Sequence, residues 1–143
     1  MIALDTNVLV YAHRADSPFH DQAARVLRDL AEGTANWAIP WPCLHEFFAV
    51  ATHPRIYDPP STPAQALAQM EAWCASPTVS LLAEELDHLD VLGRLLRAGD
   101  VRGPQVHDAR VAAVCLSAGV RELWSVDRDF SRFPQLRVVN PLR

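Results

Sequence analysis

Short apolar runs alternate with segments of helical periodicity along the chain. The first run, residues 1–4, ends abruptly at Asp5, Thr6 and Asn7, which predicts a buried strand followed by a polar turn. Residues 18–32 carry apolar side chains at helical spacing between a proline near the start and Gly33 at the end. This segment is therefore predicted to be a helix.

The other elements follow from the same kind of pattern. A helix is predicted over residues 42–52, and the four prolines of residues 53–63 predict a loop. Further helices are predicted at 64–75, 84–98 and 106–118, and short strands at 36–40, 79–82, 122–126 and 137–139. Strands that alternate with helices predict an α/β protein with a parallel sheet covered on both faces.

Length and composition are those of one globular domain over residues 1–143, because 143 residues leave no room for a second core. Half of the residues are hydrophobic and 21% are charged, which disfavours disorder and a coiled coil. The longest apolar stretch is about half a membrane span, and the first residues lack the pattern of a secretory signal. We therefore expect a cytoplasmic protein with no membrane segment.

The cysteines and basic residues exclude several kinds of chemistry. Cys43, Cys74 and Cys115 are odd in number and widely spaced, so they are interpreted as reduced core residues. All 13 basic residues are arginine, which excludes mechanisms that need a lysine, such as the P-loop and the Schiff base. The net charge of −4 at first argues against a nucleic-acid partner.

Two acids follow predicted strands. Asp5 ends the first strand, and Asp127 follows the strand predicted at 122–126. The functional crevice of an open parallel sheet lies beyond the carboxyl ends of its strands. The two carboxylates therefore meet at one edge of the sheet if these strands are neighbours. The alternative is that each aspartate only caps the helix that follows it.

Two further acids lie on predicted helices. Glu46 is flanked at helical spacing by Cys43 and Val50, so we expect a carboxylate within an apolar face, which needs a cation or a raised pKa. The alternative is a solvated glutamate on a less buried helix. Asp108 heads the apolar stripe that continues through Val111, and an attraction to the helix dipole would explain its position but not its inward direction.

Together, these four acids favour a site for Mg²⁺ or Mn²⁺, which prefer oxygen ligands. Without them 13 of the 17 acids remain, which matches the 13 arginines. The net charge of −4 is therefore consistent with one acidic site in an otherwise neutral protein. A divalent cation would neutralise this site and allow a phosphodiester to approach.

Five segments carry a resemblance to a known family. They are ALDTNVLVYA around Asp5, the helical Glu46 after the second strand, ATHPRIYDPP with TPAQALAQMEAW, HDARVAA around Asp108, and SVDRDFSRFP with LRVVNPL at the end. In this order and spacing the sequence resembles a PIN domain of the VapC-type toxin ribonucleases, over essentially the whole chain. The resemblance implies a three-layer α/β/α sandwich with a central parallel sheet.

The resemblance also implies a function. It implies a metal-dependent endoribonuclease, the toxin of a toxin–antitoxin pair, which forms a homodimer and is held inactive by a small antitoxin protein. The catalytic and metal-binding residues would be Asp5, Glu46, Asp108 and Asp127, with Mg²⁺ as cofactor and Mn²⁺ as its substitute. In that scheme a metal-activated water hydrolyses the RNA phosphodiester bond.

The resemblance implies substrate contacts from Thr6 or Asn7, beside the first acid, and from Ser125 in the last motif. A further contact is expected from Arg110, because it lies near the site. Asp129 is a second candidate for the fourth acid, and it either ligates metal or caps the following turn; we favour Asp127 for the site and the cap for Asp129. Of the four tryptophans, Trp41 is the one expected at the surface, where it could stack on a base.

Two alternatives remain to be weighed. A phosphatase of the haloacid-dehalogenase class is excluded because it needs an aspartate where this chain has Asn7, and it also needs a lysine. A catalytically inactive PIN-like module that binds RNA or a protein partner would be expected to lack one or more of the four acids. Because all four positions are filled, the sequence favours the enzyme.

Overall fold

A computed structural model describes all 143 residues and contains a five-stranded sheet. The strand order is β3-β2-β1-β4-β5, and every neighbouring pair is parallel, as the sequence predicts. The strands are β1 (Ile2–Leu4), β2 (Trp37–Pro40), β3 (Val79–Leu82), β4 (Glu122–Trp124) and β5 (Val138–Val139). The strand predicted at 122–126 is therefore two residues shorter.

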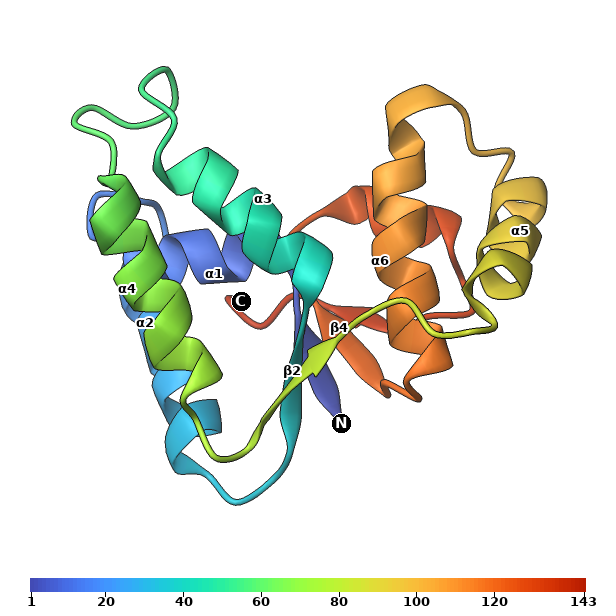
Figure 1. Ribbon diagram of the computed structural model, residues 1–143, viewed down its shortest axis with the longest axis horizontal. Coiled ribbons are helices and arrows are strands. Elements are labelled where there is room, and N and C mark those ends of the chain that lie inside the picture. The colour runs from blue at the N-terminus through green and yellow to red at the C-terminus, as the bar shows by residue number, and fades with distance from the viewer.

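Helices cover both faces of this sheet and complete an α/β/α sandwich. Figure 1 shows α1, α2 and α4 on one side of the strands, with α5 and α6 on the other. The helices are α1 (Thr6–His13), α2 (His20–Glu32), α3 (Trp41–Ala51), α4 (Pro63–Cys74), α5 (His88–Ala98) and α6 (Val106–Ser117), and short 3₁₀ turns span Gly103–Gln105 and Arg128–Arg132. None of the helices is long and apolar enough to cross a bilayer.

Helix α1 corrects the predicted polar turn after the first strand. The helix begins at Thr6, directly after Asp5, which serves as its N-cap. Val8, Leu9 and Val10 are consecutive and all buried, so the helix has no polar face that would produce a helical pattern in the sequence. The direct passage from strand to helix turns Asp5 and the first residues of α1 toward the carboxyl edge of the sheet.

Helix α5 begins later than predicted, at His88 instead of residue 84. Glu84 lies before the helix and forms an ion pair with Arg110 of α6. This tertiary contact is invisible in the local pattern. It ties the segment after β3 to α6, beside the carboxyl ends of the strands.

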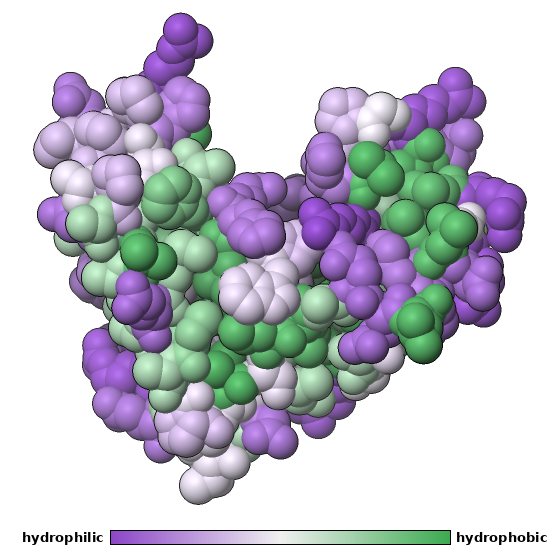
Figure 2. Space-filling model, viewed as in Figure 1, coloured by the Kyte–Doolittle hydropathy of each residue, from purple (hydrophilic) through white to green (hydrophobic).

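The molecule is hollowed above the carboxyl ends of its strands. Figure 1 shows two arms, the α3–α4 loop (residues 52–62) and the α5–α6 connection (residues 99–105), on either side of this region. Figure 2 shows the hollow between the arms, with hydrophilic residues along its floor and apolar residues along part of its sides. The candidate acids lie in this hollow.

Candidate active site

Strands β1 and β4 are neighbours, which brings their terminal acids to the same edge. Leu4 pairs with Trp124 in the parallel register, and the Asp5 backbone N–H donates to the Trp124 carbonyl at 3.0 Å. Asp127 is the third residue after β4 and lines the same pocket as Asp5. The prediction that the ends of these strands meet is confirmed.

Asp5 is buried at the floor of the pocket, with 7% of its surface exposed. Its Oδ1 accepts hydrogen bonds from the Thr6 N–H at 2.8 Å and the Cys43 thiol at 3.5 Å. Its Oδ2 accepts from the Ser125 hydroxyl at 2.7 Å and the Asn7 side-chain amide at 3.3 Å. Burial raises the pKa of Asp5, although the bonds from Ser125 and Thr6 act in the opposite direction.

Ser125 and Asn7 connect the two strand ends beneath the acids. The Ser125 hydroxyl accepts from the Asn7 amide at 3.2 Å and from the Asp127 N–H at 3.0 Å. The Asn7 carbonyl oxygen accepts from the Val126 N–H at 3.3 Å. Ser125 is 3% exposed and does not line the pocket that holds Asp5, whereas Thr6 and Asn7 do. Its hydroxyl is therefore placed to orient Asp5.

The structure assigns the capping role to Asp127, which corrects the interpretation of Asp129 as the cap. The Asp127 carboxylate accepts from the Asp129 N–H at 2.8 Å at the start of the turn Arg128–Arg132. Asp129 is exposed, yet its carboxylate forms a group with those of Asp108 and Asp127 in which the nearest oxygens lie within 4.8 Å of one another. Asp127 therefore both caps the turn and belongs to the acidic group.

Glu46 lies on α3 and is exposed, which corrects the expectation of a carboxylate enclosed by an apolar face. Its neighbour Cys43 is buried, whereas Val50 is only partly buried and lines the pocket as well as packing against the core. This side of α3 is a wall of the hollow, so Glu46 reaches the pocket from the solvent side. Partial burial and the nearby charge of Asp5 still raise its pKa.

The ionisation of Asp108 is strongly perturbed by its surroundings in the pocket. It lies in the first turn of α6 and is half-buried. Burial and repulsion from the other acids raise its pKa to about 6, with Asp127 and Asp5 the largest of the charged contributors. The pocket is therefore crowded with negative charge that the protein itself does not neutralise.

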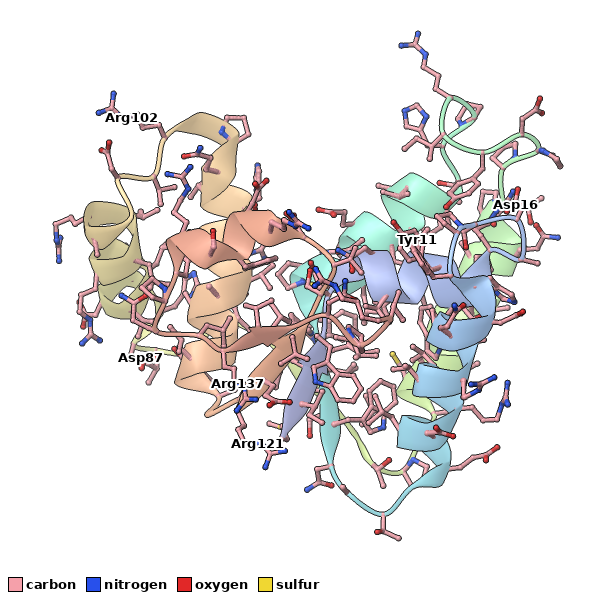
Figure 3. All side chains as sticks on the ribbon, turned by 180° about the vertical axis from the view of Figure 1, so that it is seen from behind. Tyr11, Asp16, Asp87, Arg102, Arg121 and Arg137 are labelled. Atoms are coloured by element: carbon pink, nitrogen blue, oxygen red, sulfur yellow. The ribbon has the colours of Figure 1, made fainter.

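The four predicted acids line one pocket of about 390 Å³. Thr6, Asn7 and Arg110 line it as well, together with the exposed His107. The Arg110 side chain pairs with Glu84, which holds it at the rim. Figure 3 places other arginines away from this pocket. Arg121 and Arg137 lie at the opposite end of the strands, and Arg102 lies at the tip of the α5–α6 connection.

The pocket also has an apolar part that no sequence pattern predicted, formed by Val10, Tyr11, Val50, Ile56 and Tyr57. One feature of the sequence could have indicated a binding role for Tyr57. It lies in a proline-rich loop, and binding residues concentrate on loops held by a rigid scaffold. Trp41 is exposed as expected, but it packs against His45 and does not line the pocket. The cysteines are free, as predicted.

The donor set fits a hard divalent cation. It consists of carboxylate oxygens, with no thiolate among the pocket-lining side chains and a single imidazole, that of the exposed His107. Mg²⁺ and Mn²⁺ prefer such oxygen ligands. The raised pKa values of Asp5, Glu46 and Asp108 are those expected of acids that lack a compensating cation.

Comparison with known proteins identifies the family. The sequence profile of the PIN domain matches residues 2–136. The chain belongs to the PIN domain family. This PIN domain is 34% identical over 142 residues to Ribonuclease VapC43 of Mycobacterium tuberculosis, covering 99% of this chain and 96% of the relative. It is 31% identical to Ribonuclease VapC48 of the same organism over 137 residues, or 96% and 94% of the two chains.

Solved structures share the fold of this PIN domain. A chain of VapBC2 from Rickettsia felis, solved bound to a DNA fragment from its promoter, superposes with a TM-score of 0.68 at 20% identity over 98% of both chains. VapC20 of M. tuberculosis, described as a toxin that cleaves the sarcin–ricin loop, superposes with a TM-score of 0.67 at 20% identity, covering 92% of this chain and 93% of the other. The predicted α/β/α architecture is confirmed.

Proposed function

We propose that this PIN domain is a metal-dependent endoribonuclease that acts as the toxin of a toxin–antitoxin pair. The observation that carries the proposal is the convergence of Asp5, Glu46, Asp108 and Asp127 on one pocket. Relatives of this chain at 31–34% identity over nearly the whole chain are named ribonucleases. A catalytically inactive module would not require these four acids in one pocket, where burial and repulsion between the carboxylates raise the pKa values of Glu46 and Asp108.

The chain's own residues would prepare the site for phosphodiester hydrolysis. Asp5, Glu46, Asp108 and Asp127, with Asp129 at the margin, would hold Mg²⁺, or Mn²⁺ in its place. When bound, the cation would supply an activated water and stabilise negative charge on the phosphate. The Ser125 hydroxyl fixes the orientation of Asp5, and the Glu84 ion pair fixes that of Arg110. Arg110, Thr6 and Asn7 would contact the RNA strand at the pocket.

The partners follow from the same proposal. Similar solved structures are of VapBC complexes, among them those of Rickettsia felis and Haemophilus influenzae, so we propose a small antitoxin protein as the inhibitor of this chain. We also propose a homodimer, which light scattering at micromolar concentration would test; a monomer alone would contradict it. A toxin that cleaves cellular RNA meets its substrate in the cytoplasm, which is the compartment we propose.

Cleavage of total bacterial RNA by the purified protein tests the proposal. Discrete cuts are expected with Mg²⁺, and they should disappear with EDTA and in Asp5→Asn, which removes ligand charge without removing volume. Asp100→Asn is the matched control, because Asp100 is exposed and lies outside the pocket. Its activity should equal that of the wild type.

Two results would contradict the enzyme or its site. Cleavage retained in Asp5→Asn would remove Asp5 from the catalytic set. Absence of both RNA cleavage and Mn²⁺ binding would instead favour a module that only binds RNA or a protein. Binding of Mn²⁺ at the acids, measured by calorimetry, with cuts restricted to a rare RNA would support the enzyme.

A further inference from the structure

One half of the pocket is chemically different from the acidic half. It is the apolar wall, which we define as Val10, Tyr11, Val50, Ile56 and Tyr57. These residues come from α1, α3 and the α3–α4 loop, the arm opposite the α5–α6 connection (Figure 1). Ile56 is 52% exposed, so the wall is open to an occupant. No basic residue belongs to it, which makes it unsuited to a phosphate.

Tyr57 is held in a fixed orientation within the wall. The Arg14 guanidinium lies 4.3 Å from the centre of the Tyr57 ring and covers one of its faces. Arg14 itself is fixed, because it forms hydrogen bonds of 2.9 Å and 2.7 Å to the two carboxylate oxygens of Asp16. Tyr57 also lines the pocket, so an occupant of the pocket would meet a side chain that is already held in place.

The loop that carries the wall is fastened to α1. Arg14 donates to the Pro59 carbonyl at 2.9 Å and to the Ser61 hydroxyl at 3.3 Å, and the His13 ring bonds the same hydroxyl at 2.9 Å. The Ser61 N–H donates to the Ala51 carbonyl at the end of α3. These contacts anchor the wall in the absence of ligand, so an occupant would not have to order the loop.

The second tyrosine belongs to the same surface. Tyr11 packs against Phe19 with ring centres 6.4 Å apart, and its carbonyl accepts a hydrogen bond from the His20 ring at 2.8 Å. Tyr11 and Tyr57 are close enough that the Tyr11 phenol contributes to the raised pKa of Tyr57, after burial and Asp16. Figure 3 shows Tyr11 on the side of the molecule that carries Asp16 and the α3–α4 loop. The wall therefore presents two aromatic rings.

We propose that the apolar wall is a nucleobase subsite, in which an unpaired RNA base stacks on Tyr57 beside the phosphate held at the acids. This inference rests on the proposed ribonuclease function. Unpaired bases stack on aromatic side chains in proteins that bind single-stranded RNA, and the interaction tolerates any base. A pocket of about 390 Å³ is in the range that encloses small organic ligands.

The position of the wall favours a base over an apolar side chain of a protein partner. A phosphodiester at the acids carries its own ribose and base, which must occupy space next to the acidic half of the pocket. The same pocket contains the wall, and its other two apolar lining residues, Pro42 and Val111, are not aromatic. A protein segment would have to bring an apolar group to this position independently.

Binding of mononucleotides tests the proposal, because these probes carry a base and a phosphate but no bond that the enzyme could cleave. The probes are AMP, GMP, CMP and UMP compared with ribose 5-phosphate, each titrated with Mg²⁺ by calorimetry and NMR. The wild type should bind at least one nucleotide more tightly than ribose 5-phosphate. Tyr57→Leu keeps apolar volume but removes the ring, so it should lower nucleotide affinity about 5- to 100-fold and leave ribose 5-phosphate affinity unchanged. Tyr57→Phe keeps the ring and should bind as the wild type does.

Trp41→Leu is the matched control, because Trp41 is an exposed aromatic residue outside the pocket. It should not change nucleotide affinity. If Tyr57→Leu does not fold, two measurements still test the subsite. They are the nucleotide affinity of Tyr11→Leu and the comparison of nucleotide with ribose 5-phosphate in the wild type. Nucleotides that bind no better than ribose 5-phosphate would overturn the subsite and leave the wall to an apolar protein segment.

RNA cleavage by the wild type, measured separately, distinguishes the two proposals. Cleavage without any effect of the base or of Tyr57 would overturn the subsite and leave the ribonuclease intact. Base-dependent binding through Tyr57 without RNA cleavage would support the subsite and contradict the ribonuclease.

Discussion

Replacing Asp108 by asparagine should stabilise the metal-free protein at neutral pH while it reduces cleavage. Burial, followed by the charges of the other acids, raises the pKa of Asp108 from 3.8 to about 6. Because the folded-state pKa exceeds the unfolded-state value, the stability contributed by protonated Asp108 is complete below pH 3.8. It is lost as the pH rises through about 6, and the neutral asparagine avoids this loss.

The expected gain follows from these values. Each tenfold change in an acid dissociation constant corresponds to about 1.4 kcal/mol, so the ionised carboxylate disfavours folding by at most about 3 kcal/mol. Solvent screens part of this unfavourable energy, because the Asp108 side chain is only half-buried. The neutral asparagine also loses about 0.3–1 kcal/mol of attraction to the amino end of α6. We expect Asp108→Asn to raise the free energy of unfolding by about 1 kcal/mol near pH 7.5, and to have no stabilising effect near pH 4.

Urea unfolding followed by tryptophan fluorescence, in EDTA at both pH values, measures this difference. Asp100→Asn is the control, because Asp100 and its partner Arg102 are 78% and 81% exposed and their ion pair contributes little. With Mg²⁺ present, the wild type should gain stability through binding and Asp108→Asn should gain less. A variant less stable than the wild type near neutral pH in EDTA would refute the argument from charge repulsion.

Three further substitutions have defined outcomes. Ser125→Ala removes the hydroxyl that donates to Asp5 at 2.7 Å, so it should lower the free energy of unfolding in urea by about 1–3 kcal/mol. It should also move the acidic limb of the pH–rate profile to higher pH, and an unchanged profile would argue against the role of Ser125. Arg110→Ala should raise KM for RNA more than it lowers kcat, and should reduce the log–log salt slope of RNA binding by about one, as loss of a phosphate contact predicts; an unchanged slope would place Arg110 away from the RNA. Phe47→Ala should destabilise by about 3–5 kcal/mol, since Phe47 is fully buried, whereas Leu89→Ala, 77% exposed, should not; equal losses would contradict the assigned core.

The sequence predicted the sheet and the acids because both depend on patterns that persist in the fold. Leu4 with Asp5, and the strand before Asp127, show an apolar run ending in a carboxylate, and the parallel sheet brings such ends together. Helix α1 was missed because Val8, Leu9 and Val10 are all buried, which leaves no alternation to detect. The exposure of Glu46 depends on how α3 faces the hollow, and no local pattern contains that information.

The two explanations offered for the strand-end acids turn out to be compatible, because a carboxylate has two oxygens and about four acceptor sites. Asp127 uses one oxygen to accept the Asp129 N–H, and its other oxygen has no partner within the chain. Asp5 accepts four donors, two of them at the longer distances of 3.3 and 3.5 Å. Ligation by Asp5 would therefore compete with the Asn7 amide or the Cys43 thiol, whereas Asp127 has an oxygen to spare. The short bond from Ser125 would fix the carboxylate while these weaker contacts are exchanged, so capping and orientation at the strand ends would prepare the same groups for the proposed cation.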